Sequence, residues 1–408
     1  MPGPLQGIVV LDLSRVLAGP WATQALADYG AEVIKIEKPG VGDDTRQWGP
    51  PWLKDANGRD TAQSAYYLST NRGKKSVAID LAHPAGQDLV RRLARDADVV
   101  VENFKVGGLA KYGLSYADLA DMNPRLVYVS ISAFGQDGPE AAGPGYDAMI
   151  QGMGGLMSIT GVPDGEPGAG PQKVGVAVAD LMCGMYAVSS VLAALFERQQ
   201  SGRGQYIDLA LLDTQVAWLA NQNMNYLVGG KPPSRQGTAH PNIVPYQAFA
   251  TADGYLMLSV GNDGQFARFC AVAGRPEMAA DPRYATNQSR VAHRQELVPL
   301  VQEILRTKCT ATWLDLLRTA NVPCGPINDL AQVFAEPQVR HRGLRIDLPH
   351  PTAGSVPGVR NPAIFSRTPL EYRLAPPELG ADTETVLRDR LGLQPARLAE
   401  LREAGAIG

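Results

Sequence analysis

One aspartate in an otherwise apolar stretch has the surroundings that most favour chemistry. Asp180 lies in Gly175-Val-Ala-Val-Ala-Asp-Leu-Met-Cys-Gly-Met-Tyr186, among small and apolar residues. Burying a carboxylate in such surroundings is costly unless something pairs with it, so a functional carboxylate is one interpretation and an ordinary helix N-cap is the other. The two are compatible, because a helix N-terminus stabilises an anion and keeps it ready as a nucleophile.

Basic residues gather where the strands of the first half of the chain should end. They are Lys35, Lys38, Arg46, the tetrapeptide Arg72-Gly-Lys-Lys75, Lys105 and Lys111. Loops after parallel strands form the ligand crevice of an open α/β sheet, so several of these cations are candidates for binding a phosphorylated ligand. For each single residue, a solvated surface position is the competing interpretation.

Other motifs are weaker. Gly261-Asn-Asp-Gly-Gln265 follows an apolar stretch, and its glycines favour either a mobile loop over a site or an ordinary turn. Glu37 lies about 20 residues after the first turn, where ribose-binding acids sit, but that turn lacks the GxGxxG glycines, so we expect no NAD. The five histidines have no zinc-ligand spacing, and we expect no metal.

The elements that must position these residues alternate between strands and helices. The apolar patterns predict strands over 7–13, 32–37, 76–81, 98–102 and 126–132. They predict helices from Pro20, over 84–96, over 176–198 and over 206–227. Continuously apolar strands that alternate with helices predict an α/β fold, with a Rossmann-like parallel sheet covered on both faces.

The 408 residues correspond to two or three domains of about 150 residues each. We predict a large domain over 1–228, a polar, Pro/Gly-rich linker over 229–239, and a smaller α/β domain over 240–329. Within the small domain, apolar runs flank Thr251-Ala-Asp-Gly254, which predicts a hairpin. The segment 330–408 is predicted to return to the large domain.

Charge and composition exclude several classes of protein. A net charge of -3, from 38 basic and 41 acidic residues, argues against a nucleic-acid partner. No apolar run was expected to reach the roughly 18 residues that span a bilayer, and the N-terminus does not resemble a signal peptide. The four cysteines lack CxxC spacing. We therefore expect a cytoplasmic protein without a membrane partner.

Several segments together carry a more specific signal. They are 11–20, 30–39 with 42–43, 71–76, 101–104, 145–147, and Asp180 with 201–204. Along nearly the whole chain they resemble the class III CoA-transferases, the formyl-CoA transferase-like or CaiB/BaiF type. The segments 42–51, 237–249, 325–328 and 334–339 are most similar to transferases of the succinyl-CoA:glutarate type.

The resemblance implies a homodimer of interlocked rings, with the active site between the large domain of one subunit and the small domain of its partner. It implies coenzyme A as co-substrate and Asp180 as the nucleophile. Family contacts to CoA correspond to Val16, Lys38, Ile79, Asn103, Phe104, Lys111 and Tyr112. We expect the loop amides of Gly261 and Gly264 to stabilise a developing oxyanion. Arg46 or Arg72 is the candidate residue whose guanidinium group would bind, through two N–H groups, the distal carboxylate of a dicarboxylate acceptor.

The implied activity is transfer of CoA from an acyl-CoA donor, succinyl-CoA, to a dicarboxylate acceptor such as glutarate, through an aspartyl-CoA thioester. Leu17 stands where formyl-CoA transferases carry Gln, which argues against formate and oxalate. An α-methylacyl-CoA racemase is the alternative enzyme, but Tyr146 stands where racemases carry a His base, and a phenol is a poor base near neutral pH. A CoA-binding regulatory protein without turnover is the third interpretation.

Overall fold

The computed structural model describes residues 3–408, which divide into two compact units. Unit 1 contains the chain up to Leu156, then Lys173–Lys231 and Arg340–Gly408. Unit 2 contains Met157–Gln172 and Pro232–Val339. This division differs from the predicted domains in three places. Residues 157–172 belong to unit 2, the predicted linker 229–239 is divided between the units at Pro232, and the chain returns to unit 1 at Arg340 instead of at residue 330.

A six-stranded sheet forms the centre of unit 1, in the order β5-β2-β1-β6-β7-β8, and every neighbouring pair is parallel. The strands are β1 (Val9–Asp12), β2 (Glu32–Glu37), β5 (Lys74–Ala78), β6 (Val99–Glu102), β7 (Val127–Ser132) and β8 (Tyr206–Ala210). The strand order reverses between β1 and β6, and open α/β sheets bind ligands beyond the carboxyl ends of the strands at such a point. The predicted parallel α/β sheet is confirmed.

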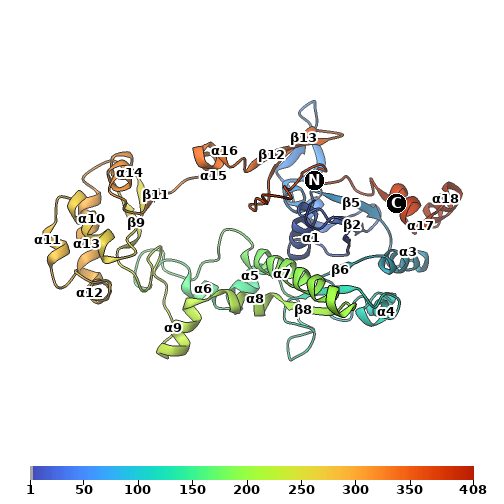
Figure 1. The fold of residues 1–408 in the computed structure, drawn as a ribbon, viewed down its shortest axis with the longest axis horizontal. Helices are drawn as coiled ribbons and strands as arrows, with labels where there is room; N and C mark the ends of the chain where they lie inside the picture. The colour runs from blue at the N-terminus through green and yellow to red at the C-terminus, as the bar shows by residue number, and fades with distance from the viewer. Residues whose placement is uncertain (1–2) are drawn as a thin grey trace. The chain divides into compact units, whose positions relative to one another are not determined.

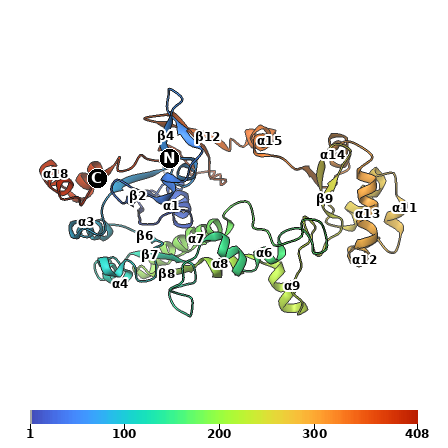
Figure 2. The ribbon, with the colours of Figure 1, turned by 180° about the vertical axis from the view of Figure 1, so that it is seen from behind.

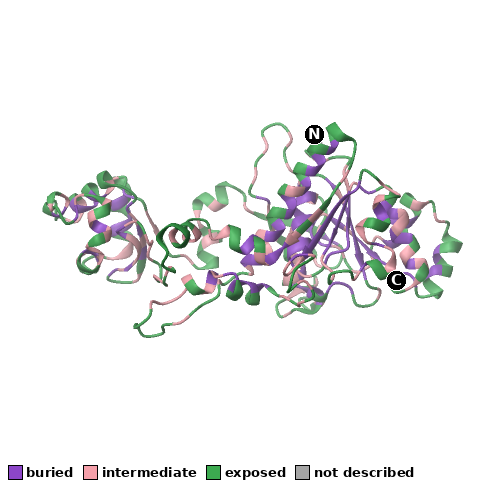
Figure 3. Cartoon of the chain, turned by 90° about the horizontal axis from the view of Figure 1, so that it is seen from below, coloured by how far each residue is buried: buried purple, intermediate pink, exposed green. Residues whose placement is uncertain are grey.

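Helices cover both faces of this sheet, because successive buried side chains of each strand point to opposite faces. Val10, Val33 and Val99 pack into one core with α1 (Ala18–Asp28), α5 (Asp147–Met153), α7 (Val178–Ser201) and α8 (Leu211–Trp218). Leu11, Ile34 and Val100 pack into the other with α3 (Pro84–Arg95), α4 (Tyr116–Ala120), α17 (Thr383–Leu391) and α18 (Pro395–Glu403). Figure 3 shows the buried strands between helices whose outer sides are exposed.

The end of the chain packs beside its first third. Helix α17 contacts β5 and α3, and Ile407 forms a bridge with Ile79. Figures 1 and 2 show the red C-terminal helices next to α3 from both sides. Residues such as Leu387 and Leu401 thereby complete the core on the α3 face of the sheet.

The predicted helix over 206–227 is wrong. Its first residues form strand β8, which pairs with β7 at the sheet edge, and the remainder forms α8 and α9 (Asn221–Gly229). Ala220, with φ of 47°, interrupts the helical backbone between α8 and α9. Pairing with a strand more than 70 residues away overrode the local helical pattern, as tertiary context commonly does.

The expectation that no apolar run reaches spanning length is wrong for α7, which is long and apolar enough to cross a membrane. Half of its most apolar window is buried inside the protein. Ala179, Cys183, Ala187 and Val191 on this helix belong to the core of unit 1. Core helices pass the same test of length and composition, so α7 is weak support for a membrane segment.

Unit 2 has its own core around an antiparallel sheet of β9 (Tyr246–Ala250), β10 (Tyr255–Ser259) and β11 (Cys324–Pro326). β9 and β10 form the predicted hairpin, which is confirmed. Phe249, Leu256, Phe266 and Trp313 pack together with α10 (Asp263–Val272), α13 (Arg294–Leu305) and α14 (Thr310–Thr319).

The remaining elements are short. They are η1 (Asp44–Gln47), β3 (Trp52–Lys54), β4 (Asp60–Ser64), α2 (Ala65–Thr70), η2 (Ala110–Tyr112), α6 (Leu156–Ile159), α11 (Glu277–Ala280), α12 (Asn287–Ala292), α15 (Leu330–Ala335), α16 (Pro337–His341), β12 (Arg345–His350) and β13 (Gly354–Val359). Of these, η1 contains Arg46 and η2 contains Lys111, two of the charged residues that were predicted to bind a ligand.

Candidate active site

Asp180 lies in the first turn of α7 and is not its N-cap. The N-cap is Ala177, which has no side-chain acceptor, so the N-cap interpretation of Asp180 is wrong. Across residues 3–408, the Asp180 carboxylate has no hydrogen-bond donor and no cation in contact. Burial, and then the negative charge of Asp147, raises the pKa of Asp180 to about 7. Above that pH, the group is a poorly solvated carboxylate that no partner stabilises, which favours reaction with an electrophile.

A carboxylate from a different helix caps α7. Asp147, the first residue of α5, accepts hydrogen bonds from the backbone N–H groups of Ala179 (2.8 Å) and Asp180 (3.3 Å). Gln151 Nε2 donates to Asp147 Oδ2 at 2.6 Å, and Gln151 Oε1 accepts from the Val174 N–H at 2.9 Å. This cap fixes the backbone of Asp180 and places a second negative charge beside it. Residues 145–147 belong to the segments that carried the resemblance, but this role of Asp147 was not predicted from the sequence.

Tyr66, which lies near Asp180, and Trp48, which packs against Tyr66, were also missed. Burial and the negative charges of Asp180 and Asp147 raise the pKa of Tyr66 to about 12, so its hydroxyl keeps its proton. The Trp48 ring lies edge-on to the Tyr66 ring, with 5.0 Å between centroids, and Trp48 is 44% exposed. Tyr66 carries no charge and lies in no motif, so the sequence offered no signal for it. Trp48 lies in the segment 42–51 that carried the resemblance, but no role was assigned to it.

Two cavities open beyond the carboxyl ends of β1, β2 and β6. The β2 cavity, of about 370 Å³, is lined by the residues that follow β1, β2 and β5. The Asp180 cavity, of about 450 Å³, is lined by Asp180 and by the loops after β1, β6 and β7. Arg15, Asp44 and Phe104 line both cavities. Each volume lies in the range of ordinary small-molecule sites.

The predicted CoA contacts fall largely on these cavities. Those on the β2 cavity are Lys38, Ile79, Phe104 and Tyr112. Those on the Asp180 cavity are Val16, Asn103 and Phe104. Lys111 lines neither cavity, and its ammonium lies 4.6 Å from the centroid of the Tyr112 ring. Six of the seven residues thus surround two adjoining spaces in unit 1.

The side chain of Asn103 is already engaged. Its Oδ1 accepts the backbone N–H of Arg15 at 2.8 Å, and its Nδ2 donates to the backbone carbonyl of Arg15 at 2.7 Å. The Asn103 amide therefore joins the loop after β6 to the loop after β1, and the second hydrogen on Nδ2 remains for a ligand.

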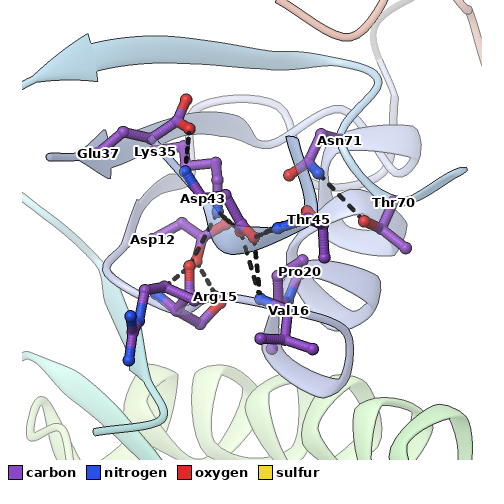
Figure 4. A network of polar contacts seen from close by, with 12 residues as sticks. Asp12, Arg15, Val16, Pro20, Lys35, Glu37, Asp43, Thr45, Thr70 and Asn71 are labelled. Carbon is purple, nitrogen blue, oxygen red and sulfur yellow. Dashed lines mark hydrogen bonds and ion pairs between the residues drawn. The ribbon is translucent and has the colours of Figure 1, made fainter. Parts of the chain in front are cut away.

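A buried network of charges forms one wall of the β2 cavity (Figure 4). Lys35 Nζ donates to Asp43 Oδ2 at 2.9 Å, and both side chains are at most 1% exposed. Thr45 Oγ1 donates to Asp43 Oδ1 at 2.7 Å. Burial alone would raise the pKa of Asp43, but the charge of Lys35 and the hydrogen bonds from Thr45 outweigh it and lower the pKa to about 2. Asp43 is therefore an anion at any ordinary pH.

Lys74 belongs to the same buried region. Its Nζ donates to Asp12 Oδ2 (3.0 Å), Asn71 Oδ1 (2.9 Å) and the Pro20 carbonyl (3.0 Å). Burial lowers the pKa of Lys74 to about 8 in spite of the Asp12 carboxylate. The cations of Lys35 and Lys74 thus hold the sheet and its loops together.

Arg46 and Arg72, the predicted forks for a distal carboxylate, lie in internal ion pairs. Arg46 donates to both oxygens of Glu37 at 2.8 and 2.7 Å, and Arg72 donates to both oxygens of Asp28 at 2.9 and 2.6 Å. The two arginines are 6% and 8% exposed, and neither lines the Asp180 cavity. The structure does not bring them together with Asp180, because each guanidinium neutralises a buried carboxylate of its own.

The glycine loop begins helix α10 in unit 2. Asn262 is the N-cap and accepts the Gln265 N–H at 2.9 Å. Gln265 Oε1 accepts the Gly261 N–H at 2.6 Å. An oxyanion would therefore have to replace the Gln265 side chain at the Gly261 amide, whereas Gly264 lies in the open first turn of the helix.

Two adjoining cavities at the switch point of a doubly wound parallel sheet are typical of an α/β enzyme that binds a small molecule, and Asp180, which has no partner among the described residues, lines one of them. The sequence profile of CoA-transferase family III matches residues 5–383. The chain therefore belongs to CoA-transferase family III, and it is a class III CoA-transferase.

The chain is also similar to individual proteins that are CoA-transferases or CaiB/BaiF family members. The chain is 56% identical over 391 residues to the succinate–glutarate CoA-transferase of Agrobacterium fabrum, with 95% of each chain covered. It is 44% identical over 407 residues to the human succinyl-CoA:glutarate CoA-transferase, covering 99% of this chain and 90% of that protein. The crystal structure of a CaiB/BaiF family protein from Brucella suis is 47% identical, with a TM-score of 0.84, covering 96% of this chain and all of that one.

Proposed function

We propose that this protein transfers CoA from succinyl-CoA to glutarate and that Asp180 carries the CoA between them. The succinyl-CoA:glutarate-type CoA-transferases of human and Agrobacterium fabrum are 44% and 56% identical to the chain over nearly its whole length. The observation that carries the mechanism is the Asp180 carboxylate, which lines a cavity and has no hydrogen-bond donor or cation in contact within the described residues 3–408.

In the first half-reaction, the Asp180 carboxylate attacks the thioester carbonyl of succinyl-CoA. The carbon–sulfur bond breaks, CoA leaves as its thiolate, and Asp180 and the succinyl group form a mixed anhydride. The thiolate then attacks the Asp180 carbonyl of the anhydride and expels succinate. The product is a thioester between Asp180 and CoA, and no proton is gained or lost.

In the second half-reaction, a carboxylate of glutarate attacks the Asp180 thioester and releases the thiolate again. The thiolate attacks the glutaryl carbonyl of the new anhydride, which gives glutaryl-CoA and restores the Asp180 carboxylate. Anhydride and thioester are both activated acyl groups, so every step is an exchange between comparable species. Water must be excluded, and we propose that the loop 261–265 of a partner subunit covers the anhydride and that its amides stabilise the oxyanion.

The pKa of Asp180 suits this role. Asp180 must be ionised to attack, so burial and Asp147, which raise its pKa to about 7, place the ionisation near neutral pH. A carboxylate with a raised pKa is also a stronger nucleophile than a solvated one.

The acceptor needs a cation for its second carboxylate, and we propose Arg15 in place of Arg46 or Arg72. Arg15 lines the Asp180 cavity. Within residues 3–408, its ion-pair partner is Asp44 at 3.0 Å, and the two side chains are 50% and 47% exposed. Such exposed pairs contribute little to stability, so Arg15 can exchange Asp44 for a substrate carboxylate.

We further propose that the enzyme is a homodimer. Large apolar side chains are exposed along α7 and α9, including Phe196 (67%), Leu227 (70%) and Val228 (80%). Leu227 and Val228 are neighbours on α9, and neighbouring exposed apolar side chains are candidates for a subunit interface. Co-expression of an Asp180→Ala subunit with a Gly261→Trp subunit tests whether the site is shared: activity returns in the mixed dimer if Asp180 and the loop come from different subunits, and stays absent if both come from one.

The chemical test is the mass of the intact protein after exposure to succinyl-CoA. Borohydride reduces an aspartyl thioester to an alcohol. We therefore expect the peptide that contains Asp180 to become lighter by the mass difference between a carboxyl group and a hydroxymethyl group, and we expect no change in Asp180→Asn. A modification on any other peptide, or none at all, would contradict the mechanism. Parallel assays with glutarate, itaconate, mesaconate and malate identify the preferred acceptor.

Deuterium separates transfer from racemisation. A racemase abstracts the proton next to the thioester carbonyl, so 2-methylacyl-CoA would incorporate deuterium from heavy water. We expect the enzyme to exchange CoA without incorporating deuterium.

A further inference from the structure

Val16 has a backbone conformation that its side chain disfavours. Its φ is 69°, in the left-handed region, where β-branched residues are rare outliers. Within residues 3–408, the other non-glycine residues with positive φ are Ala220 and Asn321, and neither is β-branched. Val16 lines the Asp180 cavity, whereas those two residues do not. A strained backbone persists only where surrounding contacts hold it, and it often marks a functional site.

The contacts that hold Val16 come from Asp43. Both carboxylate oxygens of Asp43 lie within hydrogen-bond distance of the Val16 N–H, at 3.2 and 3.3 Å (Figure 4). Asp43 itself is fixed by Lys35 and by the backbone N–H and hydroxyl of Thr45. Its own N–H donates to Glu37 Oε2 at 2.9 Å. The carboxylate that meets Val16 is therefore buried, ionised and immobile.

The loop that contains Val16 borders both cavities. Arg15, immediately before Val16, lines both cavities, and Leu17 and Ala18, immediately after it, line the Asp180 cavity. Asn103 holds the backbone of Arg15 from the other side. Helix α1 begins at Ala18 and has no side-chain cap, so the backbone turn at Val16 decides how the helix starts.

We propose that Asp43 is a positioning residue, which holds Val16 in the left-handed conformation so that the loop 15–18 forms the wall between the two cavities across which CoA binds. Asp43 acts through Val16 and does not touch the reacting atoms. The proposal rests on the proposed function, because it requires a CoA ester that extends from the β2 cavity to Asp180.

Glycine at position 16 provides the decisive comparison, because glycine adopts positive φ without strain and needs no clamp. In the otherwise wild-type enzyme, Asp43→Asn is expected to lower kcat/KM for succinyl-CoA about 10- to 100-fold. A loss of this size corresponds to the free energy that is stored in one strained backbone residue. Added to Val16→Gly, the same substitution is expected to cost less than about 3-fold, since the strain is already gone. Equal losses in the two backgrounds, or no loss in either, would overturn the proposal.

Asp28→Asn is the matched control. Asp28 is a buried carboxylate that pairs with Arg72, and it lines neither cavity. This substitution is expected to lower the Tm and to have the same effect on kcat/KM whether or not Val16→Gly is present. If Asp43 were merely structural, Asp43→Asn would behave in this additive way.

Two further measurements keep the test decisive. If Asp43→Asn does not fold, Asp43→Glu keeps the charge beside Lys35 but moves the carboxylate by one methylene, and the same non-additivity with Val16→Gly is expected. The Kd for CoA, measured by calorimetry, reports on the conformation of the loop 15–18 independently of catalysis. Absence of CoA exchange in the wild-type enzyme would refute the proposed function, whereas additive effects on this Kd would refute the role of Asp43.

Discussion

Asp180 and Asp43 are both largely buried in unit 1, each lines one of two adjoining cavities, and their pKa values move in opposite directions. Burial and Asp147 raise the pKa of Asp180 to about 7, whereas Lys35 and Thr45 overcome burial and lower that of Asp43 to about 2. Both groups are desolvated, so desolvation alone does not separate them. The difference is the partner: Asp43 has a cation and several donors, and Asp180 has a second carboxylate nearby.

Under the proposed mechanism, this contrast separates a structural carboxylate, Asp43, from a reactive one, Asp180. Partners that stabilise the anion of Asp43 also make it a poor nucleophile, because its lone pairs are occupied. The absence of such partners destabilises the folded protein at Asp180 but leaves the oxygen atoms free to attack. The two regions therefore predict opposite consequences of removing a charge.

The largest expected effect is the loss of catalysis in Asp180→Ala. Without the nucleophile, CoA exchange should fall by at least about 10⁴-fold, because no covalent intermediate can form. CoA binding, measured by calorimetry, should stay within a few fold of the wild type, since most of the predicted CoA contacts remain. Exchange near the wild-type rate would contradict the covalent mechanism.

The paired region should instead lose stability when one partner is removed. Arg46→Met and Arg72→Met each leave a buried carboxylate without its cation, which should lower the free energy of unfolding by about 3–5 kcal/mol. Chemical denaturation measures this loss. By contrast, Arg15→Met should leave stability nearly unchanged and raise the KM for the acceptor. If a stable Arg46→Met or Arg72→Met protein had a raised KM for the acceptor, the substituted arginine would be the residue that binds the distal carboxylate.

The pH dependence of stability should have opposite signs at the two carboxylates. The pKa of Asp180 is about 7 in the folded protein and near 3.8 in the unfolded chain, so its ionisation destabilises the fold as pH rises from about 4 to 7. Asp180→Asn removes this cost and should raise the free energy of unfolding at pH 8 by up to about 4 kcal/mol, with little effect at pH 4.

Asp43 provides the control for that measurement. Its folded pKa is about 2, so its ionisation stabilises the fold above about pH 4, and this stabilisation is lost as pH falls to about 2. Asp43→Asn should therefore destabilise the protein at pH 8. If Asp180→Asn also destabilised it there, the Asp180 carboxylate would have a stabilising partner after all.

The smallest effect concerns the pH profile. Asp147→Asn removes the charge that helps to raise the pKa of Asp180 and keeps an oxygen that accepts the Ala179 N–H. The pKa of Asp180 should fall, so the acid limb of kcat/KM against pH should move to lower pH, by roughly one unit. A limb that stays in place would mean that another group controls it.

Much of the fold was predictable because local patterns and long-range pairing agreed. β2 begins and ends at the predicted residues, and α3 begins at Pro84 as predicted. β8 was missed because a short strand at the sheet edge, with alternating exposure, resembles the start of an amphipathic helix. Only its pairing with β7 distinguishes the two.

Prediction of the site depended on the kind of signal. Asp180 was identified because a single carboxylate among apolar residues can be recognised from the sequence alone. Asp147 and Tyr66 lie 33 and 114 positions before it and have no local feature that connects them to it. Arg46 and Arg72 were chosen for their charge, but their charge is neutralised by Glu37 and Asp28, which no spacing rule would pair with them.

The chain by itself determined the class of fold, the positions of most strands and the identity of one unusual carboxylate, because hydrophobic periodicity and composition are local properties. Tertiary structure decided which charges are neutralised, which remain free, and why Asp180 lacks the counter-charge that Asp43 possesses. The physical reason is that ionisation in a protein interior depends on the few groups within several ångströms, and the folded chain collects those groups from distant parts of the sequence.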